Sequence, residues 1–411
     1  MASILPFRAL RPTKEIAPKL ASRPYDVLNS QEAREEAAGN PESFLHITKS
    51  EIDLPENIDI HTQAVYEKAK ENIQQFIEKG WLFREDKPCY YIYRLIMNGR
   101  SQTGIVAVSS VNDYEKDIIK KHEFTRPEKE LDRINHIKTS GAQTGNVFLA
   151  YKNVPAIDAL VELWQNSHKA DYDFTASDGI QHTIWVVADS EVIGTLTDLF
   201  ESKVPCTYIA DGHHRAASAA KVRKALGKKA PDGTNYFLTT LFPSNQLHIL
   251  DYNRVVKDLN GMDEEELLSY LQDDFNVTLI GSEAYRPEHL HDFGMYLGGK
   301  WYKLTARRDS YATDPIGVLD VTILSQTILS KLFGIKDQRT DKRIDFVGGI
   351  RGLGELEKRV NSGEMAVAFS LYPVSIQQLF DIADMGEVMP PKSTWFEPKL
   401  RDGLLTHLIY E

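Results

Sequence analysis

The segment over residues 204–227 constrains the fold more than any other part of the chain, because an apolar strand runs into a polar turn and then a helix. The hydrophobic run predicts a buried strand over 205–210. Gly212 permits the tight turn, and strong helix formers follow over 216–226. Gly227 then ends the predicted helix.

The turn itself carries His213, His214 and Arg215 at the place where the helix begins. The first amides of a helix and its positive end attract anions, and a guanidinium adds a fork of donors that suits phosphate or carboxylate. Asp211 supplies a carboxylate one turn away. The segment therefore predicts an anion site, while a helix capped by Asp211 beside surface histidines is the alternative that the same residues allow.

The composition is that of a soluble globular protein with two, or at most three, domains, since the chain has 411 residues. No apolar run approaches the roughly 20 residues that span a bilayer, so we expect a cytoplasmic protein without a membrane partner. The net charge of -11 disfavours a general nucleic-acid binder. Cys89 and Cys206 lie in apolar strand-like runs, which predicts reduced core residues rather than disulfides or a zinc cluster.

Helix and strand signals alternate along the chain, which is typical of α/β or α+β proteins. Asn29 and Glu32 predict the capped start of a short helix, and Asn98-Gly99 predicts a hairpin whose loop is longer than two residues. Other strands are expected over 89–97, 104–109, 147–151, 182–188 and 235–242, other helices over 156–167, 263–275 and 321–332, and a second hairpin over 294–304.

The domain organisation that we expect is a core over 1–250 and an α+β lobe over 251–411. The weakest seam lies between about Asn245 and Gly261. We expect the C-terminal segment of the lobe to contribute to the same site as the anion-binding turn.

Two segments before the turn also concentrate polar chemistry. Arg23 and Asp26 flank an extended stretch fixed by a proline, which fits either a binding role or an edge segment. His122, Glu123 and Arg126 follow one another closely, and Glu123 beside His122 is a candidate general base. A solvated helix face is the plainer interpretation of so many charges.

A third segment, over residues 389–399, presents Lys392, Ser393 and Thr394 after two prolines. An ammonium group and two hydroxyls are the groups that hold a triphosphate and its magnesium in other nucleotide sites, although the glycines of a Walker loop are missing here.

The segments around Arg23, His122, Asp211 and Lys392, in this order along nearly the whole chain, resemble the prokaryotic domain-of-unknown-function family numbered ten-fifteen. The turn from Asp211 to Arg215 is in addition similar to the glycine-x-x-arginine turn of the ParB/sulfiredoxin superfamily, which places a nucleotide phosphate there. This resemblance implies a ParB/sulfiredoxin-like nucleotide-binding α/β core with a second α+β lobe. Sulfiredoxins carry a catalytic cysteine where this chain has His213, which excludes thiol chemistry.

The superfamily includes ATP- or ADP-dependent free-serine kinases, and the resemblance implies the same activity here. Its implied roles are acid/base catalysis by Asp211 and Glu123 and phosphate binding by His213, His214 and Arg215. The turn at Gly212 belongs to the same phosphate site, and the residue types add Lys392 on the phosphates and Ser393 or Thr394 near the magnesium. The residue types favour Arg23, Asp26, His122 and Arg126 for binding the substrate, with an arginine on its carboxylate.

The expected reaction is phosphoryl transfer from ATP or ADP, with Mg²⁺, to the hydroxyl of a small metabolite such as free L-serine. This reaction needs cations and a metal around the phosphates and a carboxylate that aligns the attacking hydroxyl. Two other classes stay open. One is a nucleotide-binding or partner-binding protein without turnover, and the other is a hydrolase whose metal is held by histidines, Asp211 and Glu123.

Overall fold

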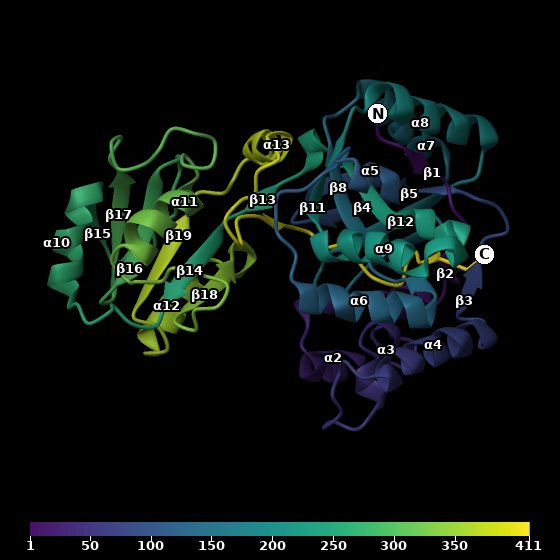
Figure 1. The fold of residues 1–411 in the computed structure, drawn as a ribbon, viewed down its shortest axis with the longest axis horizontal. Coiled ribbons are helices and arrows are strands. Elements are labelled where there is room, and N and C mark those ends of the chain that lie inside the picture. The colour runs from purple at the N-terminus through teal and green to yellow at the C-terminus, as the bar shows by residue number, and fades with distance from the viewer. Residues whose placement is uncertain (411) are drawn as a thin grey trace. The chain divides into compact units, whose positions relative to one another are not determined.

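The structure, a computed structural model, describes residues 1–410 and separates into two compact units (Figure 1). The first unit comprises Met1–Leu247 together with the C-terminal segment that begins at Pro398, and the second comprises His248–Glu397. The division after Leu247 falls in the predicted seam. The segment from Pro398 onward, which the sequence places in the second lobe, belongs to the first unit.

The first unit is built on a mixed sheet, which has nine strands among the described residues. Its order is β6-β11-β8-β12-β5-β4-β10-β9, with β1 added on β5; the β11–β6 and β12–β8 pairs are parallel, and the remaining pairs are antiparallel. The strands of this sheet are β1 (Ile4–Leu5), β4 (Tyr90–Met97), β5 (Arg100–Ser110), β6 (Ile119–Lys120), β8 (Val147–Tyr151), β9 (Tyr172–Thr175), β10 (Gln181–Val187), β11 (Thr207–Asp211) and β12 (Tyr236–Pro243). Two short pairs complete the unit, β2 (Leu10–Pro12) with β3 (Leu82–Arg84) and β7 (Ala142–Gln143) with β21 (His407–Leu408).

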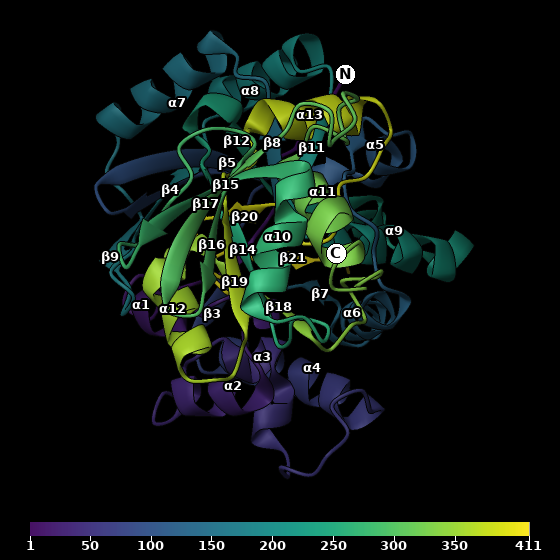
Figure 2. The same cartoon turned by 90° about the vertical axis from the view of Figure 1, so that its left-hand side faces the viewer.

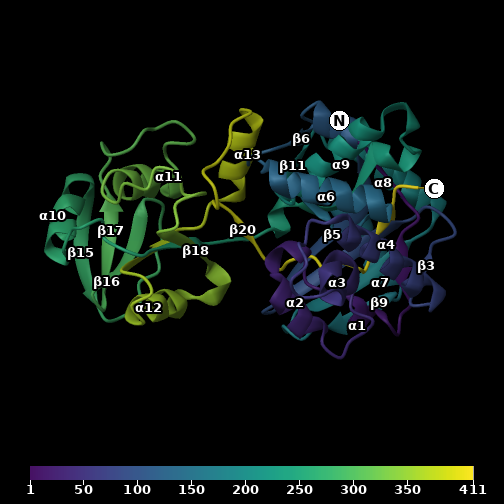
Figure 3. The same ribbon diagram turned by 60° about the horizontal axis from the view of Figure 1, so that its bottom comes forward.

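Helices surround this sheet, and their packing decides which loops meet (Figures 1 and 3). Helix α6 packs between α9 and α4, while α7 packs against α8. The helices of the unit are α1 (Ala17–Leu20), α2 (Ser30–Ala37), α3 (Leu45–Thr48), α4 (Gln63–Glu78), α5 (Val111–Glu115), α6 (Pro127–Ser140), α7 (Pro155–Ser167), α8 (Ser190–Lys203) and α9 (His213–Leu226). The capping box predicted at Asn29 and Glu32 is confirmed at the start of α2.

The loop length predicted for the first hairpin is wrong. Met97 pairs directly with Arg100, so β4 and β5 are joined by the two residues Asn98 and Gly99 alone. Both have positive φ, 51° and 76°. Positive φ at both positions is the conformation of the tight hairpin turn that asparagine and glycine favour, and it matches the twist of the strands. Strand β5 therefore begins at Arg100, closer to the turn than the start at residue 104 that the hydrophobic pattern indicates.

The second unit has a six-stranded sheet of order β15-β17-β16-β19-β14-β18 among the described residues, and every neighbouring pair in it is antiparallel (Figure 2). Its strands are β14 (Tyr252–Val256), β15 (Phe275–Gly281), β16 (Asp292–Leu297), β17 (Lys300–Ala306), β18 (Ile344–Gly348) and β19 (Val367–Leu371), and a separate pair joins β13 (Ile249–Leu250) to β20 (Trp395–Phe396). Its helices are α10 (Glu264–Asp274), α11 (Asp320–Leu324), α12 (Leu353–Asn361) and α13 (Ile376–Asp384). The hairpin predicted over 294–304 is confirmed between β16 and β17, which are joined by Gly298 and Gly299.

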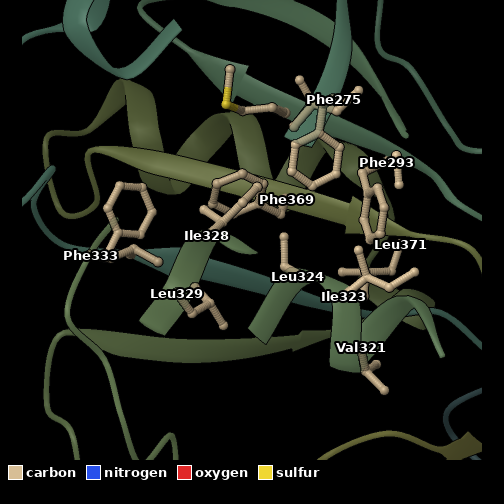
Figure 4. Close-up of a cluster of buried hydrophobic side chains, with 14 of the residues drawn as sticks. Phe275, Phe293, Val321, Ile323, Leu324, Ile328, Leu329, Phe333, Phe369 and Leu371 are labelled. Atoms are coloured by element: carbon tan, nitrogen blue, oxygen red, sulfur yellow. The ribbon is translucent and has the colours of Figure 1, made fainter. Parts of the chain in front are cut away.

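The core of the second unit forms where α11 and the residues after it cover the sheet (Figure 4). Phe293 and Phe369 come from the sheet, and Leu324 and Ile328 come from the helical side. The helix predicted over 321–332 is regular only to Leu324, because a π-helical segment follows over Ser325–Ser330. Burial of this apolar face holds the segment in place.

Together the two units confirm the α/β class that the alternating signals predict. Within residues 1–410, no helix is long and apolar enough to cross a membrane. Cys89 is buried and Cys206 is partly exposed, and neither forms a disulfide.

Candidate functional site

The junction between β11 and α9 is the strand–turn–helix that the sequence predicts, but the helix begins at His213 rather than at residue 216. His213, His214 and Arg215 therefore form its first turn. Gly212 precedes them with a φ of 98°, a conformation that side chains other than glycine's rarely adopt. A Cβ at Gly212 would also lie 3.0 Å from Arg215 Nε, so this position needs glycine for its backbone and for space.

Arg215 lies folded back over this turn, with a side chain that is only 8% exposed. Its Nη2 forms an ion pair with Asp211 and lies 3.5 Å from Asp26 Oδ2, while Nη1 donates to the carbonyl of Asn146. Burial lowers the pKa of Arg215, but the charges of Asp26 and Asp211 outweigh burial and raise it above its usual value. Its Nε has no hydrogen-bond partner among the described residues. The guanidinium thus faces carboxylates of the protein itself.

Asp211 receives a second cation from the C-terminal segment, because Lys399 Nζ lies 3.2 Å from its Oδ1. Burial would raise the pKa of Asp211, but Lys399 and Arg215 together hold that pKa well below its usual range. Asp211 is therefore ionised and engaged at both oxygens, which makes it a weak proton acceptor.

Asp402, also from the C-terminal segment, adds a third carboxyl group to this cluster. It is 2% exposed, and its Oδ2 accepts a hydrogen bond of 3.4 Å from the Tyr25 amide. Burial raises the pKa of Asp402 to about 7, against the opposing charge of Arg215. The junction therefore combines Asp211, an ionised carboxylate, with Asp402, a carboxyl group that titrates near neutrality.

The two histidines of the first turn hold the segment over 122–126 against α9. His213 Nε2 accepts a hydrogen bond of 3.4 Å from the His122 amide, and His214 Nε2 accepts one of 2.9 Å from the Arg126 amide. Each neutral ring then carries its proton on Nδ1, and His213 Nδ1 lies 3.8 Å from Glu123 Oε2.

The pKa values of these rings agree with the neutral form. Burial and the neighbouring His122 lower the pKa of His213 well below its usual value. Burial lowers the pKa of His122 to about 4 and also lowers that of His214. These rings are therefore neutral near pH 7 and do not contribute positive charge to the site.

A cavity of about 600 Å³ opens within the first unit beside this junction. His214 reaches its wall from α9, and Tyr25 and Asp26 reach it from the N-terminal segment. The rest of the wall is Leu28, Thr48, Lys49, Ser50, Glu51, Ile60, His61, Val65, Tyr66, Glu128, Lys129, Asp132, Arg133 and His136. The cavity thus combines cationic, acidic and aromatic side chains between the α2–α4 segment and α6.

The other candidate residues are distributed as follows. Arg23 pairs with Glu36 at 2.5 Å in an exposed ion pair and does not reach the cavity wall. Lys392, Ser393 and Thr394 belong to the second unit, and their place in a shared site stays a prediction. There Ser393 Oγ donates to the Pro390 carbonyl at 2.6 Å, and Lys392 Nζ lies 5.8 Å from the centre of the Tyr252 ring.

Several residues of the site carry no role in the sequence-based prediction: Lys49, His61, Asp132, Arg133, Lys399 and Asp402. Asp132 and Arg133 stand in a charged run of α6 that resembles an ordinary solvated helix face. A signal for Lys399 was its place at the end of the polar segment over 389–399. Nothing in the local sequence marks His61 or Asp402.

A metal centre built from the histidines of the turn is poorly supported by the donor atoms. Nε2 of His213 and of His214 each accept a backbone N–H, and Asp211 is occupied by two cations. No group of three or more histidine, cysteine or acidic residues in the described part of the chain could hold a metal ion. A nucleotide-bound Mg²⁺ needs only one or two protein carboxylates, and the carboxylates on the cavity wall include Asp26 and Glu128.

Comparison with known proteins gives one match to a family model, "Protein of unknown function (DUF1015)", over residues 4–322. This match confirms the resemblance in the sequence. No curated protein matches the chain.

Solved structures that the comparison matches to this chain include a conserved hypothetical protein from Pyrococcus furiosus, at 15% identity and a TM-score of 0.36, covering 73% of this chain and 93% of that one. A free serine kinase in complex with AMP is 14% identical, with a TM-score of 0.35 and coverage of 74% and 91%. SbnI from Staphylococcus aureus, truncated at its C-terminus, is 11% identical, with a TM-score of 0.36 and coverage of 72% and 85%. Identities and TM-scores this low do not indicate what this chain binds.

Proposed function

This chain belongs to the family described as "Protein of unknown function (DUF1015)", and we propose that it is a nucleotide-dependent phosphotransferase. It moves a phosphoryl group from ATP or ADP to the hydroxyl of a small metabolite, with free L-serine as the first candidate. The proposal includes a ParB/sulfiredoxin-like core in the first unit, which rests on the turn from Asp211 to Arg215.

The observation that carries the proposal is the position of His214, which belongs to the first turn of α9 and also lines the cavity of about 600 Å³. A cavity of this volume lies within the range of roughly 300–1,000 Å³ that is usual for small-molecule sites. The start of α9 has no side-chain cap. An anion in the cavity near His214 would gain from the positive end of that helix.

Basic side chains on the same wall favour a phosphorylated ligand. Lys49, Lys129 and Arg133 line the cavity together with His214. Phosphoryl transfer depends on positioning and on cations around the transferred group, rather than on covalent chemistry by the protein. We assign Lys129 and the N–H of His214 to the phosphates, whereas Arg133 pairs with Asp132 and Lys49 lies 3.0 Å from Glu51. Mg²⁺ on the nucleotide would neutralise further phosphate charge.

Arg215 has a different role in this proposal from the one that its residue type suggests. Its guanidinium fixes Asp26 and Asp211 at the edge of the site. It therefore shapes the turn that presents His213 and His214, and direct phosphate contact is left to the other cations and, in the sequence-based hypothesis, to Lys392, Ser393 and Thr394. Arg126, next to His214, remains the candidate for the substrate carboxylate.

A nucleotide-binding protein without turnover remains the second candidate, because Asp211 is held in ion pairs by Arg215 and Lys399 and is a weak base. The two functions differ in whether the nucleotide is consumed. A metal-dependent hydrolase has less support, since the donor atoms of its expected ligands are already engaged.

The test is to incubate the full chain with ATP or with ADP, MgCl₂ and a mixture of small hydroxy metabolites that includes L-serine. Mass spectrometry should detect a phosphorylated product and the matching loss of nucleotide. Nucleotide binding without any such product would support the non-catalytic alternative, and absence of both would contradict the proposal.

A further inference from the structure

A histidine and an aspartate from different elements meet on the cavity wall. His61 lies just before α4, and Asp132 lies on α6. His61 Nδ1 is 3.3 Å from Asp132 Oδ1. The His61 side chain is 60% exposed, so its ring is accessible to a ligand, while the Asp132 side chain is only 17% exposed.

Asp132 is held in one orientation by its other partners. Its Oδ1 also accepts from the Tyr66 hydroxyl at 2.9 Å, and its Oδ2 accepts from Arg133 Nε and Nη2 at 2.8 and 2.6 Å. Burial would raise the pKa of Asp132, but the charge and hydrogen bonds of Arg133, with the Tyr66 hydroxyl, lower it overall. Asp132 is therefore an ionised carboxylate near neutral pH.

This arrangement determines which nitrogen of His61 carries the proton. An ionised carboxylate only accepts hydrogen bonds, so Nδ1 of His61 must be the donor in the pair. Nε2 of the neutral ring is then unprotonated. A histidine oriented in this way by a carboxylate is suited to take a proton from a hydroxyl group.

We propose that His61 is the proton acceptor of the phosphoryl transfer and that Asp132 is its positioning residue. This inference rests on the proposed function. The substrate hydroxyl oxygen forms a bond to the transferred phosphorus, and the bond from that phosphorus to the bridging oxygen of the nucleotide breaks. The hydroxyl proton passes to His61 Nε2, and the nucleotide leaves as ADP from ATP, or as AMP from ADP.

The two carboxylates that the sequence suggests are less suited to this step. Asp211 is engaged by Lys399 and Arg215, which hold its pKa well below the usual range. Glu123 lies beside His213. Neither Asp211 nor Glu123 is among the described residues that line the cavity, whereas His61 and Asp132 both line it.

The experiment compares the wild type with His61→Gln, Glu123→Gln and His289→Gln. His289 is the matched control, because it is an exposed histidine 3.9 Å from Asp292 in the second unit. Each protein is given ATP or ADP, MgCl₂ and L-serine, and both kcat for phosphoserine and nucleotide affinity are measured. We expect His61→Gln to lose a factor of about 10² to 10⁴ in kcat with affinity largely retained, and His289→Gln to match the wild type.

Other outcomes separate this inference from the proposed function. An active wild type with equally active His61→Gln overturns the role of His61, and so does a loss that reflects weaker nucleotide binding alone. A loss confined to Glu123→Gln would move the role to Glu123. A wild type that phosphorylates neither L-serine nor another hydroxy metabolite would refute the proposed function and, with it, the reaction step.

A measurement that needs no activity tests the geometry. ¹⁵N NMR of the His61 ring should show the Nδ1-protonated tautomer in the wild type. Asp132→Asn should shift the ring towards the Nε2-protonated form, because an amide can donate where the carboxylate only accepts. An Nε2-protonated ring in the wild type would overturn the inference.

Discussion

Lys399 Nζ lies 3.2 Å from Asp211 Oδ1, which joins the C-terminal segment to the turn between β11 and α9. The two residues are 188 positions apart in the chain. Their contact places a cation beside a carboxylate that Arg215 already engages. The C-terminal segment is thus part of the site and helps to keep Asp211 ionised.

Replacement of Lys399 by methionine should destabilise the first unit. Loss of a charge-assisted hydrogen bond to a partly buried carboxylate costs about 1–2 kcal/mol of unfolding free energy. Lys68→Met is the control, because Lys68 is similarly exposed but pairs with Glu71 on the surface of α4. That change should cost less than about 0.5 kcal/mol in urea unfolding. Equal losses in the two variants would show that the contact with Asp211 contributes little.

Gly212→Ala should destabilise the protein more than Gly80→Ala. Both positions have positive φ, 98° and 69°, so both substitutions strain the backbone. Only the Cβ at position 212 meets another group, because nothing lies within 4 Å of the one at position 80. We expect about 1 kcal/mol for Gly80→Ala and a further 1–3 kcal/mol for Gly212→Ala, from displacement of Arg215. Thermal unfolding of the two variants measures this difference.

The sequence predicts the local part of this site and not the long-range part. The strand, the glycine turn and the helix from β11 to α9 follow from hydrophobic runs and turn chemistry, which act between neighbours in the chain. Arg215 is correctly placed at the turn by the sequence. Its partners Asp26 and Asp211, however, come together through tertiary packing, so residue type alone does not predict these ion pairs.

The same distinction explains the residues that the sequence misses. His61 lies before α4 and Asp132 on α6, and they meet only because those two helices pack together. Local patterns also mislead at the first hairpin, where Asn98 and Gly99 form the whole loop although the second predicted strand begins only at residue 104. Turn chemistry at these two residues is the better guide there.

The titration of Asp402 should lower the free energy of unfolding as pH rises from about 4 to about 7. The pKa of Asp402 is raised to about 7 in the folded protein, against about 3.9 for an unfolded aspartate. Below about pH 4 both states are protonated, and between the two values the unfolded chain releases its proton first, so unfolding becomes more favourable. Asp402→Asn removes this dependence.

Urea unfolding at pH 5 and pH 8 tests this prediction. The free energy of unfolding of Asp402→Asn, relative to the wild type, should be higher at pH 8 than at pH 5, by on the order of 1–3 kcal/mol. The same difference between variant and wild type at both pH values would mean that Asp402 does not titrate in this range.

The cavity that His214 and Lys129 line is the centre of the proposed function, and thermal unfolding in the presence of nucleotide tests it most directly. ATP or ADP with MgCl₂, at about a hundredfold excess over the dissociation constant, should stabilise the wild type by about 2.7 kcal/mol. Lys138→Ala, an exposed lysine of the same helix that does not line the cavity, should keep this gain. Lys129→Ala should lose a clear part of it at the same nucleotide concentration. No stabilisation of the wild type, or an equal gain in Lys129→Ala and the wild type, would contradict a nucleotide site in this cavity.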